Sequence, residues 1–358
     1  TISVDSNVTA EGESAVNSKL LAGLQDELPQ LKREDSYVGS DACRECHPNE
    51  HASWHKSYHR TMTQIALPGK VLGDFSNQTI ESAGLRYRVF RRGDEYWAEM
   101  PDPDRMLDFA RGDPSVDPQK LPLVERRVVM TTGSHHYQTY WVGHNKFDTV
   151  LNTLPLVYLP QQERWIPREA AFISPPNDPH RMITIWNDHC INCHSTGGNP
   201  GLKGPKTLLT SVGELGISCE ACHGPGENHV AKYRELPLNP NSENRTELVN
   251  PVELDHVRSS QVCGQCHGVF IRRGKQGMKF AREGVQFRPG EDLLEYRHYI
   301  QFPQEDSPAS VHAAFRANRE FFRERWWDDG TILAGGREYT AMQGTECFTQ
   351  GEMSCLSC

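Results

Sequence analysis

The chain has 358 residues, a formal net charge of −9 at pH 7 and only 37% hydrophobic residues. The acidic balance argues against nucleic-acid binding and favours basic or neutral protein partners. No run of apolar residues is long enough to cross a bilayer as a helix, so we expect no membrane span in this chain. With 29 glycines and 23 prolines, much of the polypeptide is expected to be loop.

The N-terminal part divides into an arm and a first cysteine-containing segment. Residues 1–35 are polar and acidic and are predicted to form an arm, with a short helix near residues 19–28. Residues 36–77 contain Cys43-Arg44-Glu45-Cys46-His47 and then a stretch of helical composition from residue 48 to residue 66. Within that stretch a four-residue spacing places three histidines on one helical face, namely His51, His55 and His59.

Residues 78–172 change to a β-rich composition and contain no cysteine. Two β-rich runs flank Arg91-Arg92-Gly93-Asp94, which predicts a hairpin. Further β-rich runs cover residues 127–131, 137–142 and 150–158. We therefore expect a small β insertion, which ends at the proline-rich run of residues 174–179.

The C-terminal half holds the remaining cysteine pairs. Residues 173–275 contain three more pentapeptides of the same kind, Cys190-Ile191-Asn192-Cys193-His194, Cys219-Glu220-Ala221-Cys222-His223 and Cys263-Gly264-Gln265-Cys266-His267. Residues 276–358 are predicted to contain one helix, residues 309–327, before a fifth pair, Cys355-Leu356-Ser357-Cys358. That pair stands at the last residue of the sequence, where a histidine would come next.

Cys-x-x-Cys-His is the attachment signature of c-type haem. The two thiols add to the vinyl groups of the haem, and the adjacent histidine becomes the proximal ligand of the iron. The sequence therefore predicts at least five covalently attached haem c groups. Their proximal iron ligands in the complete motifs are His47, His194, His223 and His267.

Structural zinc and disulfide bonds are the alternatives for paired cysteines. Paired Cys-x-x-Cys knuckles form tetrahedral zinc sites, but zinc does not need a histidine directly after each second cysteine. Ten of the eleven cysteines belong to the five pairs, and Cys347 remains alone. It is predicted to be a buried, inert thiol, with an intermolecular disulfide or a role in a site as alternatives.

Each haem iron needs a second axial ligand, or it stays open for chemistry. Twelve histidines lie outside the four complete motifs. The leading distal candidates are His59, His229 and one of the pair His135 and His136. If residues 135 and 136 lie in a strand, their side chains point to opposite faces, and the sequence does not separate them.

Haem surfaces replace part of the side-chain core, so we expect a mainly α and loop protein packed around haem, with the small β insertion. Covalent attachment takes place outside the cytoplasmic membrane. Residues 1–5 have neither a basic start nor an apolar core. We therefore expect a mature, exported protein of the periplasm or cell exterior whose leader has been removed. The interrupted fifth motif predicts that the natural chain continues beyond residue 358.

Residues around the motifs resemble a known group of multihaem cytochromes. The pattern Trp54-x-x-Ser57-x-His59-x-x-Met62 is similar to tetrahaem cytochromes of nitrifying bacteria. The run from Cys219 to Gly226, with His229, resembles the wider superfamily that includes hydroxylamine oxidoreductase and nitrite-reducing octahaem enzymes. Three further runs look like those of a longer branch of these proteins, whose members carry about seven or eight haems. The runs are Thr132–His136, Gly336–Tyr339 and Gly351–Cys355. This resemblance implies bis-histidine haems in closely stacked pairs, with His59 and His229 as distal ligands.

Two functions are compatible with these motifs and spare histidines. The preferred hypothesis is electron transfer between redox donor and acceptor proteins, within a homo- or hetero-oligomer or a larger extracellular assembly, because candidate distal ligands are plentiful. The competing hypothesis is an oxidoreductase that acts on a small nitrogen or sulfur compound at one open haem. Kinship of fold does not establish activity, and the sequence assigns no catalytic residue.

Overall fold

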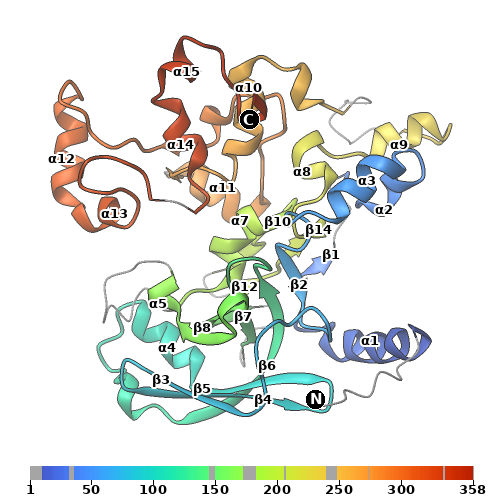
Figure 1. The fold of residues 1–358 in the computed structure, drawn as a ribbon, viewed down its shortest axis with the longest axis vertical. Coiled ribbons are helices and arrows are strands. Elements are labelled where there is room, and N and C mark those ends of the chain that lie inside the picture. The colour runs from blue at the N-terminus through green and yellow to red at the C-terminus, as the bar shows by residue number, and fades with distance from the viewer. Residues whose placement is uncertain are drawn as a thin grey trace. The chain divides into compact units, whose positions relative to one another are not determined.

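The computed structural model describes residues 10–31, 36–144, 150–171, 183–204, 207–238, 248–272, 274–333 and 335–357. The chain forms two compact units (Figure 1). Unit 1 comprises residues 1–30, 58–190 and 204–210, and unit 2 comprises residues 31–57, 191–203 and 211–358. Two short strands, β1 (Gln30–Leu31) and β11 (Leu202–Gly204), cross the boundaries between the units.

An antiparallel sheet of eight strands is the main element of unit 1. Its order is β3-β4-β5-β6-β7-β8-β9, and β2 pairs with β6. The strands are β2 (Thr63–Ile65), β3 (Gln78–Ser82), β4 (Leu85–Arg92), β5 (Glu95–Pro101), β6 (Leu123–Thr132), β7 (Gln138–Gly143), β8 (Leu151–Leu159) and β9 (Arg164–Pro167). The other elements of this unit are α1 (Ala10–Leu24), α4 (Pro103–Ala110), η1 (Pro118–Lys120), η2 (Pro160–Gln162), α5 (Arg168–Ala171), a π-helical turn η3 (Trp186–Cys190) and β12 (Thr207–Leu208).

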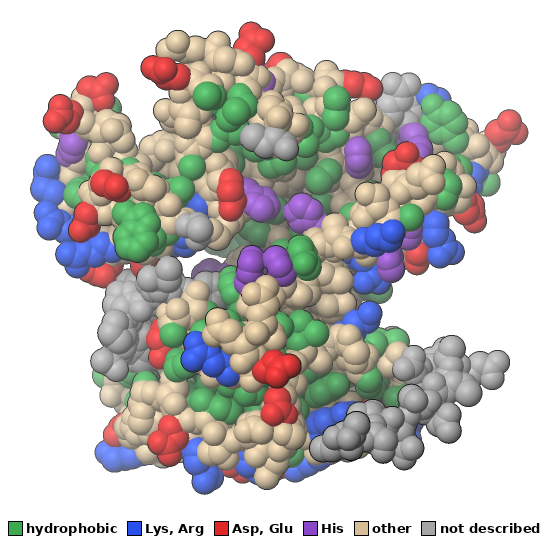
Figure 2. All heavy atoms as spheres, viewed as in Figure 1, with side chains coloured by type: hydrophobic (Ala, Val, Ile, Leu, Met, Phe, Trp, Pro, Cys, Tyr) green, Lys and Arg blue, Asp and Glu red, His purple; other side chains and the backbone are tan. Residues whose placement is uncertain are grey.

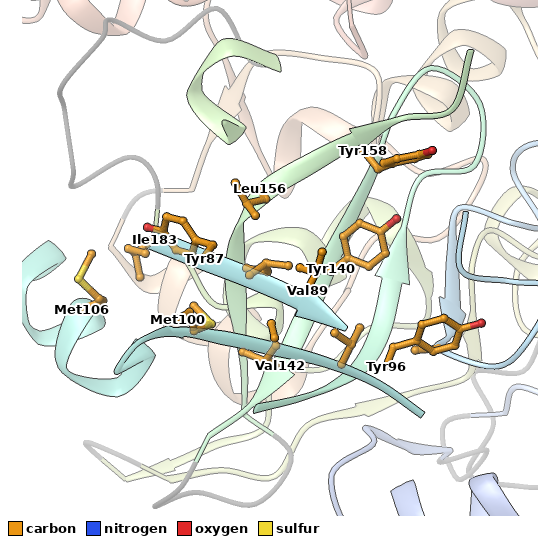
Figure 3. Close-up of a cluster of buried hydrophobic side chains, with 14 of the residues drawn as sticks. Tyr87, Val89, Tyr96, Met100, Met106, Tyr140, Val142, Leu156, Tyr158 and Ile183 are labelled. Carbon is orange, nitrogen blue, oxygen red and sulfur yellow. The ribbon is translucent and has the colours of Figure 1, made fainter. Parts of the chain in front are cut away.

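Alternation of side chains explains the core of this sheet. Along β4, Leu85, Tyr87 and Val89 are buried while the intervening arginines are more exposed, as expected for a strand with one covered face. Figure 3 shows Tyr87 and Val89 gathered with side chains of β5, β7 and β8, and with Met106 of α4. On the other face Arg88 Nη2 lies 3.0 Å from Glu99 Oε2 of the paired strand. Unit 1 therefore has a hydrophobic core made of its own side chains.

The predicted hairpin is confirmed. β4 and β5 pair in antiparallel register, with Phe90 opposite Trp97 and Arg92 opposite Glu95. Gly93 in the connecting turn has a φ of 59°, a backbone conformation that glycine adopts without steric cost. The three later β-rich runs lie in β6, β7 and β8.

The expected fold class is wrong. Helix accounts for 36% and strand for 24% of the structure, so the protein is a mixed α and β protein and not mainly α with a small β insertion. The reason is that the alternating apolar residues of unit 1 build a complete sheet with its own core. The predicted N-terminal helix is also displaced, because α1 ends at Leu24. The proline-rich run 174–179 lies outside the described residues.

Unit 2 consists of short helices joined by loops and two-residue strands (Figure 1). Its helices are α2 (Asp41–Arg44), α3 (Pro48–His55), α7 (Ile191–His194), α8 (Cys219–His223), α9 (Glu227–Tyr233), η4 (Pro251–Glu253), α10 (His256–Gly264), α11 (Lys275–Glu283), η5 (Leu293–Glu295), α12 (Ala309–Ala317), α13 (Arg319–Arg323), α14 (Glu338–Gln343), α15 (Glu346–Thr349) and η6 (Cys355–Ser357). Its strands are β10 (Ser195–Thr196), β13 (Ser211–Val212), β14 (Glu214–Leu215), β15 (Phe270–Ile271) and β16 (His298–Tyr299). Within the described residues, no helix is both long and apolar enough to cross a membrane.

Two of the predicted helices are shorter than expected. The helix expected over residues 48–66 ends at His55, so only His51 and His55 share a helical face, with ring centroids 5.8 Å apart. His59 lies beyond the helix, and the prediction of a three-histidine face is wrong. The helix expected over residues 309–327 is split at Asn318, whose φ of −140° and ψ of 55° end α12 before α13 begins.

Cys347 is exposed on α15, so its prediction as a buried thiol is also wrong. The helix that carries it has a side-chain cap, since Thr345 Oγ1 accepts a hydrogen bond from Phe348 N. In this helix Phe348 is the buried residue, and Cys347 points away from the interior.

Gly264 allows a close contact between α10 and α14. A Cβ atom built on Gly264 would lie 2.6 Å from Cδ1 of Tyr339, and Tyr339 is fully buried. We expect Gly264→Ala to lower the free energy of unfolding by about 1–3 kcal/mol, because overpacking forces a buried ring out of its place. Thermal and denaturant unfolding followed by circular dichroism measure this change.

Gly277→Ala is the matched control, since Gly277 lies inside α11 and its added Cβ would have an ordinary contact of 3.6 Å. Alanine is favoured over glycine inside a helix by about 0.5–1 kcal/mol, so this variant is expected to be slightly more stable. Equal stability of the two variants would contradict the packing explanation.

Candidate haem-binding site

Each complete Cys-x-x-Cys-His sequence forms or adjoins a short helical turn. The first lies at α2, the second at α7, the third at α8 and the fourth at the end of α10. A helical turn brings residues three and four positions apart to the same side, so the two cysteines and the histidine of one motif lie together. The amide of His267, for example, donates to the carbonyl of Cys263 at 3.0 Å. Cys355 begins η6, while Cys358 lies outside the described residues.

The cysteines of different motifs are brought together in unit 2. The side chain of Cys43 of the first motif lies beside that of Cys219 of the third. Cys193 of the second motif and Cys266 of the fourth form another such pair, and Cys263 and Cys355 form a third. In the free thiols, before haem attachment, this proximity lowers the pKa of Cys193 beside Cys266 and raises the pKa of Cys43 beside Cys219.

Two polar side chains, Gln265 and Arg297, join the motifs further. Gln265, inside the fourth motif, donates from Nε2 to the carbonyl of Ala221 in the third motif at 2.8 Å. Arg297 is 2% exposed, and it donates to the carbonyl of Gln265 and, at 3.0 Å, to Asn192 Oδ1 in the second motif. The buried guanidinium therefore links the second and fourth motifs, because its donors need acceptors away from water.

Two of the four predicted proximal histidines carry hydrogen bonds typical of metal ligands, whereas the buried Nδ1 of His194 has no hydrogen-bond partner among the described residues. Nδ1 of His223 donates to the carbonyl of Val249 at 2.8 Å, and Nδ1 of His267 lies 2.8 Å from Glu338 Oε2. A metal-ligating histidine usually donates its second ring nitrogen to a carbonyl or carboxylate, which fixes the tautomer and the ring orientation. Burial lowers the pKa of His194 to about 4, which favours the neutral imidazole that binds metals. Thiols and histidines of this kind fit covalently bound haem.

The distal candidates fall in two different places. His229 lies on α9 in unit 2, and its ring centroid is 6.4 Å from that of His47, with a tilt of 30°. His59, His135 and His136 belong to unit 1. There the rings of His135 and His136 lie 4.0 Å apart in the bend after β6, and His135 stacks on Tyr58 at 4.1 Å. Residues 135 and 136 are thus in a bend and not in a strand.

Zinc knuckles bring four ligands to one point. In the part of the chain that the structure describes, no three His, Cys, Asp or Glu side chains converge as a metal site of that kind requires.

Comparisons with known proteins agree with the motifs. Residues 171–224, which include the second and third motifs, match the family model described as cytochrome c554 and c-prime. The cytochrome c-554 of Nitrosomonas europaea is 39% identical to this chain over 62 residues. Together with the four complete motifs, these matches indicate covalently bound haem c with iron. The chain is a multihaem c-type cytochrome.

The similarity to these proteins is partial. The alignment with cytochrome c-554 covers 16% of this chain and 24% of that protein. A solved structure, the outer cell wall cytochrome OcwA, is similar over 84% of this chain and 50% of its own, with a TM-score of 0.45 and 18% identity. The chain therefore spans a quarter to a half of the lengths of these relatives.

Glu220 links parts of the candidate site, and the sequence analysis did not predict this role. It stands between the cysteines of the third motif and is 3% exposed. Its carboxylate accepts hydrogen bonds from the amides of Val38, Gly39 and Gly226 at 2.8–2.9 Å. Burial raises the pKa of Glu220, and the three amides oppose this effect. The carboxylate thereby ties the segment before the first motif to the third motif. The only sequence signal was an acidic residue inside a haem motif.

Trp54 provides a second link between the same motifs. Its Nε1 donates to the carbonyl of Ile217 at 2.8 Å, two residues before Cys219. The tryptophan of the pattern that resembles other cytochromes thus anchors α3 beside the third motif.

We expect Glu220→Ala to lower the free energy of unfolding of the cytochrome by about 3 kcal/mol, because each buried amide left without an acceptor costs about 1–3 kcal/mol. The same variant should weaken the contact between the first and third motifs and so lower the haem content per chain. Denaturant unfolding and quantitative haem analysis provide the two measurements.

Glu283→Ala is the control, because Glu283 is exposed at the end of α11 and surface substitutions usually change stability by less than about 0.5 kcal/mol. If Glu220→Ala and Glu283→Ala had the same stability and haem content, the carboxylate would not hold the two motifs together.

Proposed function

We propose that this cytochrome transfers electrons through closely spaced haems outside the cytoplasm, between a redox donor protein and a redox acceptor protein. Haem iron supplies reversible one-electron chemistry between its ferric and ferrous states. The observation that carries the proposal is the series of direct contacts between attachment motifs in unit 2. Redox centres exchange electrons fast only over short separations, and attachment at contacting motifs favours such separations.

The contacts define an order of the motifs. Cys43 and Cys219 connect the first motif to the third, and the hydrogen bond from Gln265 to Ala221 connects the third to the fourth. From the fourth motif, Cys266 contacts Cys193 of the second and Cys263 contacts Cys355 of the fifth. The fourth motif is therefore the branch point of the proposed electron pathway.

The pair His47 and His229 supports bis-histidine ligation at the first motif. The ring centroids of these two histidines lie 6.4 Å apart, so both imidazoles are near the first motif. Histidine is a common second axial ligand of haem iron, and we assign His229 as the distal ligand that would complete the haem attached at Cys43 and Cys46.

The partners are proposed from charge and compartment. Covalent haem attachment outside the cytoplasmic membrane supports a periplasmic or extracellular location, in an oligomer or a larger assembly. The net charge of −9 favours neutral or basic redox partners. Figure 2 shows acidic and basic side chains interspersed on the visible face of each unit, which suits transient docking. We assign His59 and one of His135 and His136 as further distal ligands.

Low-temperature electron paramagnetic resonance tests the proposed function. If every haem has two axial ligands, the ferric protein shows low-spin signals alone, and nitrite, hydroxylamine and cyanide leave the spectrum unchanged. A high-spin signal equal to one haem, together with binding of one of these molecules, would instead favour an oxidoreductase. Intact mass and the pyridine haemochrome give the number of haems per chain.

We expect His229→Ala to convert one haem to the high-spin state, because removal of the distal imidazole leaves its iron with one protein ligand. Resonance Raman and electron paramagnetic resonance spectra measure the spin state. His298→Ala is the control, since His298 is exposed on β16, and it should leave the spectrum as in the wild type. An unchanged spectrum of His229→Ala at full haem content would remove His229 as a ligand.

A further inference from the structure

The proximal histidine of the fourth motif has a charged hydrogen-bond partner. His267 Nδ1 lies 2.8 Å from Glu338 Oε2, a residue 71 positions later in the chain. His223 of the third motif makes a hydrogen bond of the same length, 2.8 Å, to the backbone carbonyl of Val249. The two hydrogen bonds therefore have the same length but differ in the charge of the acceptor. The haem of the third motif can thus serve as the reference for the haem of the fourth.

Glu338 is held in place by the start of α14. Its second oxygen, Oε1, accepts a hydrogen bond from the amide of Gly336 at 3.2 Å. The neighbouring residue, Tyr339, donates from its amide to the carbonyl of His267 at 2.8 Å. Thr340 Oγ1 accepts from the amide of Val269, also at 2.8 Å. Three successive residues of α14 thus contact residues 267–269, so the position of the carboxylate follows from the fold.

A carboxylate acceptor changes how strongly the histidine donates electron density to a bound metal. A hydrogen bond from Nδ1 to an anion makes the imidazole a stronger electron donor than a bond to a neutral carbonyl. A stronger donor stabilises ferric iron relative to ferrous iron, which lowers the reduction potential. The Glu338 side chain is 63% exposed, so solvent screens its charge at a distance. The effect is therefore expected at the directly bonded histidine and not at every haem.

We propose that Glu338 is a positioning residue that lowers the reduction potential of the haem attached at Cys263 and Cys266, relative to the haem attached at Cys219 and Cys222. This inference rests on the proposed electron-transfer function. Since the fourth motif contacts the second, third and fifth, Glu338 acts on the branch point of the pathway. Electrons that arrive along the first and third haems meet a step of lower potential there, which regulates their passage to the second and fifth.

Glu338→Gln tests the proposal in the complete haem-loaded protein. Glutamine keeps an acceptor oxygen at nearly the same position but removes the charge, so a purely structural role would leave the potential unchanged. Spectroelectrochemical titration should show one haem shifted to higher potential by about tenfold in its reduction equilibrium, which is about 59 mV for a one-electron couple. The remaining haems should keep their wild-type potentials.

Glu346→Gln is the matched control, because it removes the same charge from an exposed position on the next helix, α15. It should shift none of the haems. Near-infrared magnetic circular dichroism gives a second readout: in the wild type one low-spin haem should have a charge-transfer band distinct from the others, and Glu338→Gln should move that band alone.

The results distinguish this inference from the proposed function. The role of Glu338 would be overturned if Glu338→Gln kept all haems low-spin and shifted no reduction potential. It would also be overturned if Glu338→Gln and Glu346→Gln both shifted the potentials of all haems equally. In either case the proposed electron transfer would remain. If the wild-type protein lacked haem or showed no reversible one-electron steps, the proposed function itself would fail.

Discussion

The close approach of the haem-attachment motifs is the constraint on which unit 2 depends. Their cysteines lie beside one another across motifs, and hydrogen bonds between the motifs hold the helical turns in this arrangement. The links between them are polar and buried, as with Glu220 and Arg297. Buried polar groups are costly unless their partners are in place, so each link stabilises one arrangement of the motifs and penalises the others.

Unit 1 is built on a different principle. Its sheet packs a contiguous set of aliphatic and aromatic side chains, among them Tyr87, Met100 and Tyr140, without any cysteine motif between β2 and β9. Stability there comes from burial of apolar surface. In unit 2 the short helices α2, α7 and α8 are too brief to be stable alone. They form because the chain around them is fixed by contacts distant in sequence, and covalently held haem would add apolar surface to the same places.

The sequence predicted what is local and missed what is distant. Each Cys-x-x-Cys-His motif and the β4–β5 hairpin are defined by a few adjacent residues, and the structure confirms the hairpin. The three-histidine face failed because α3 ends at His55, which a composition argument over residues 48–66 does not detect. The full sheet was underestimated because β2, β3 and β9 were missed. These strands have only three to five residues, too few for an alternating pattern to stand out.

The hydrogen-bond partners of the proximal histidines could not be read from the sequence for the same physical reason. Glu338 and His267 are brought together by the packing of α14 against α10, and nothing near either residue indicates the other. Yet one local feature makes that packing possible. Gly264, between the cysteines of the fourth motif, leaves room for the ring of Tyr339, and the amide of Tyr339 then donates to the carbonyl of His267. Glu338 directly precedes Tyr339, so this packing also places the Glu338 carboxylate beside His267. Gly264 itself binds neither haem nor iron, yet it allows the packing that gives the proximal histidine a carboxylate acceptor.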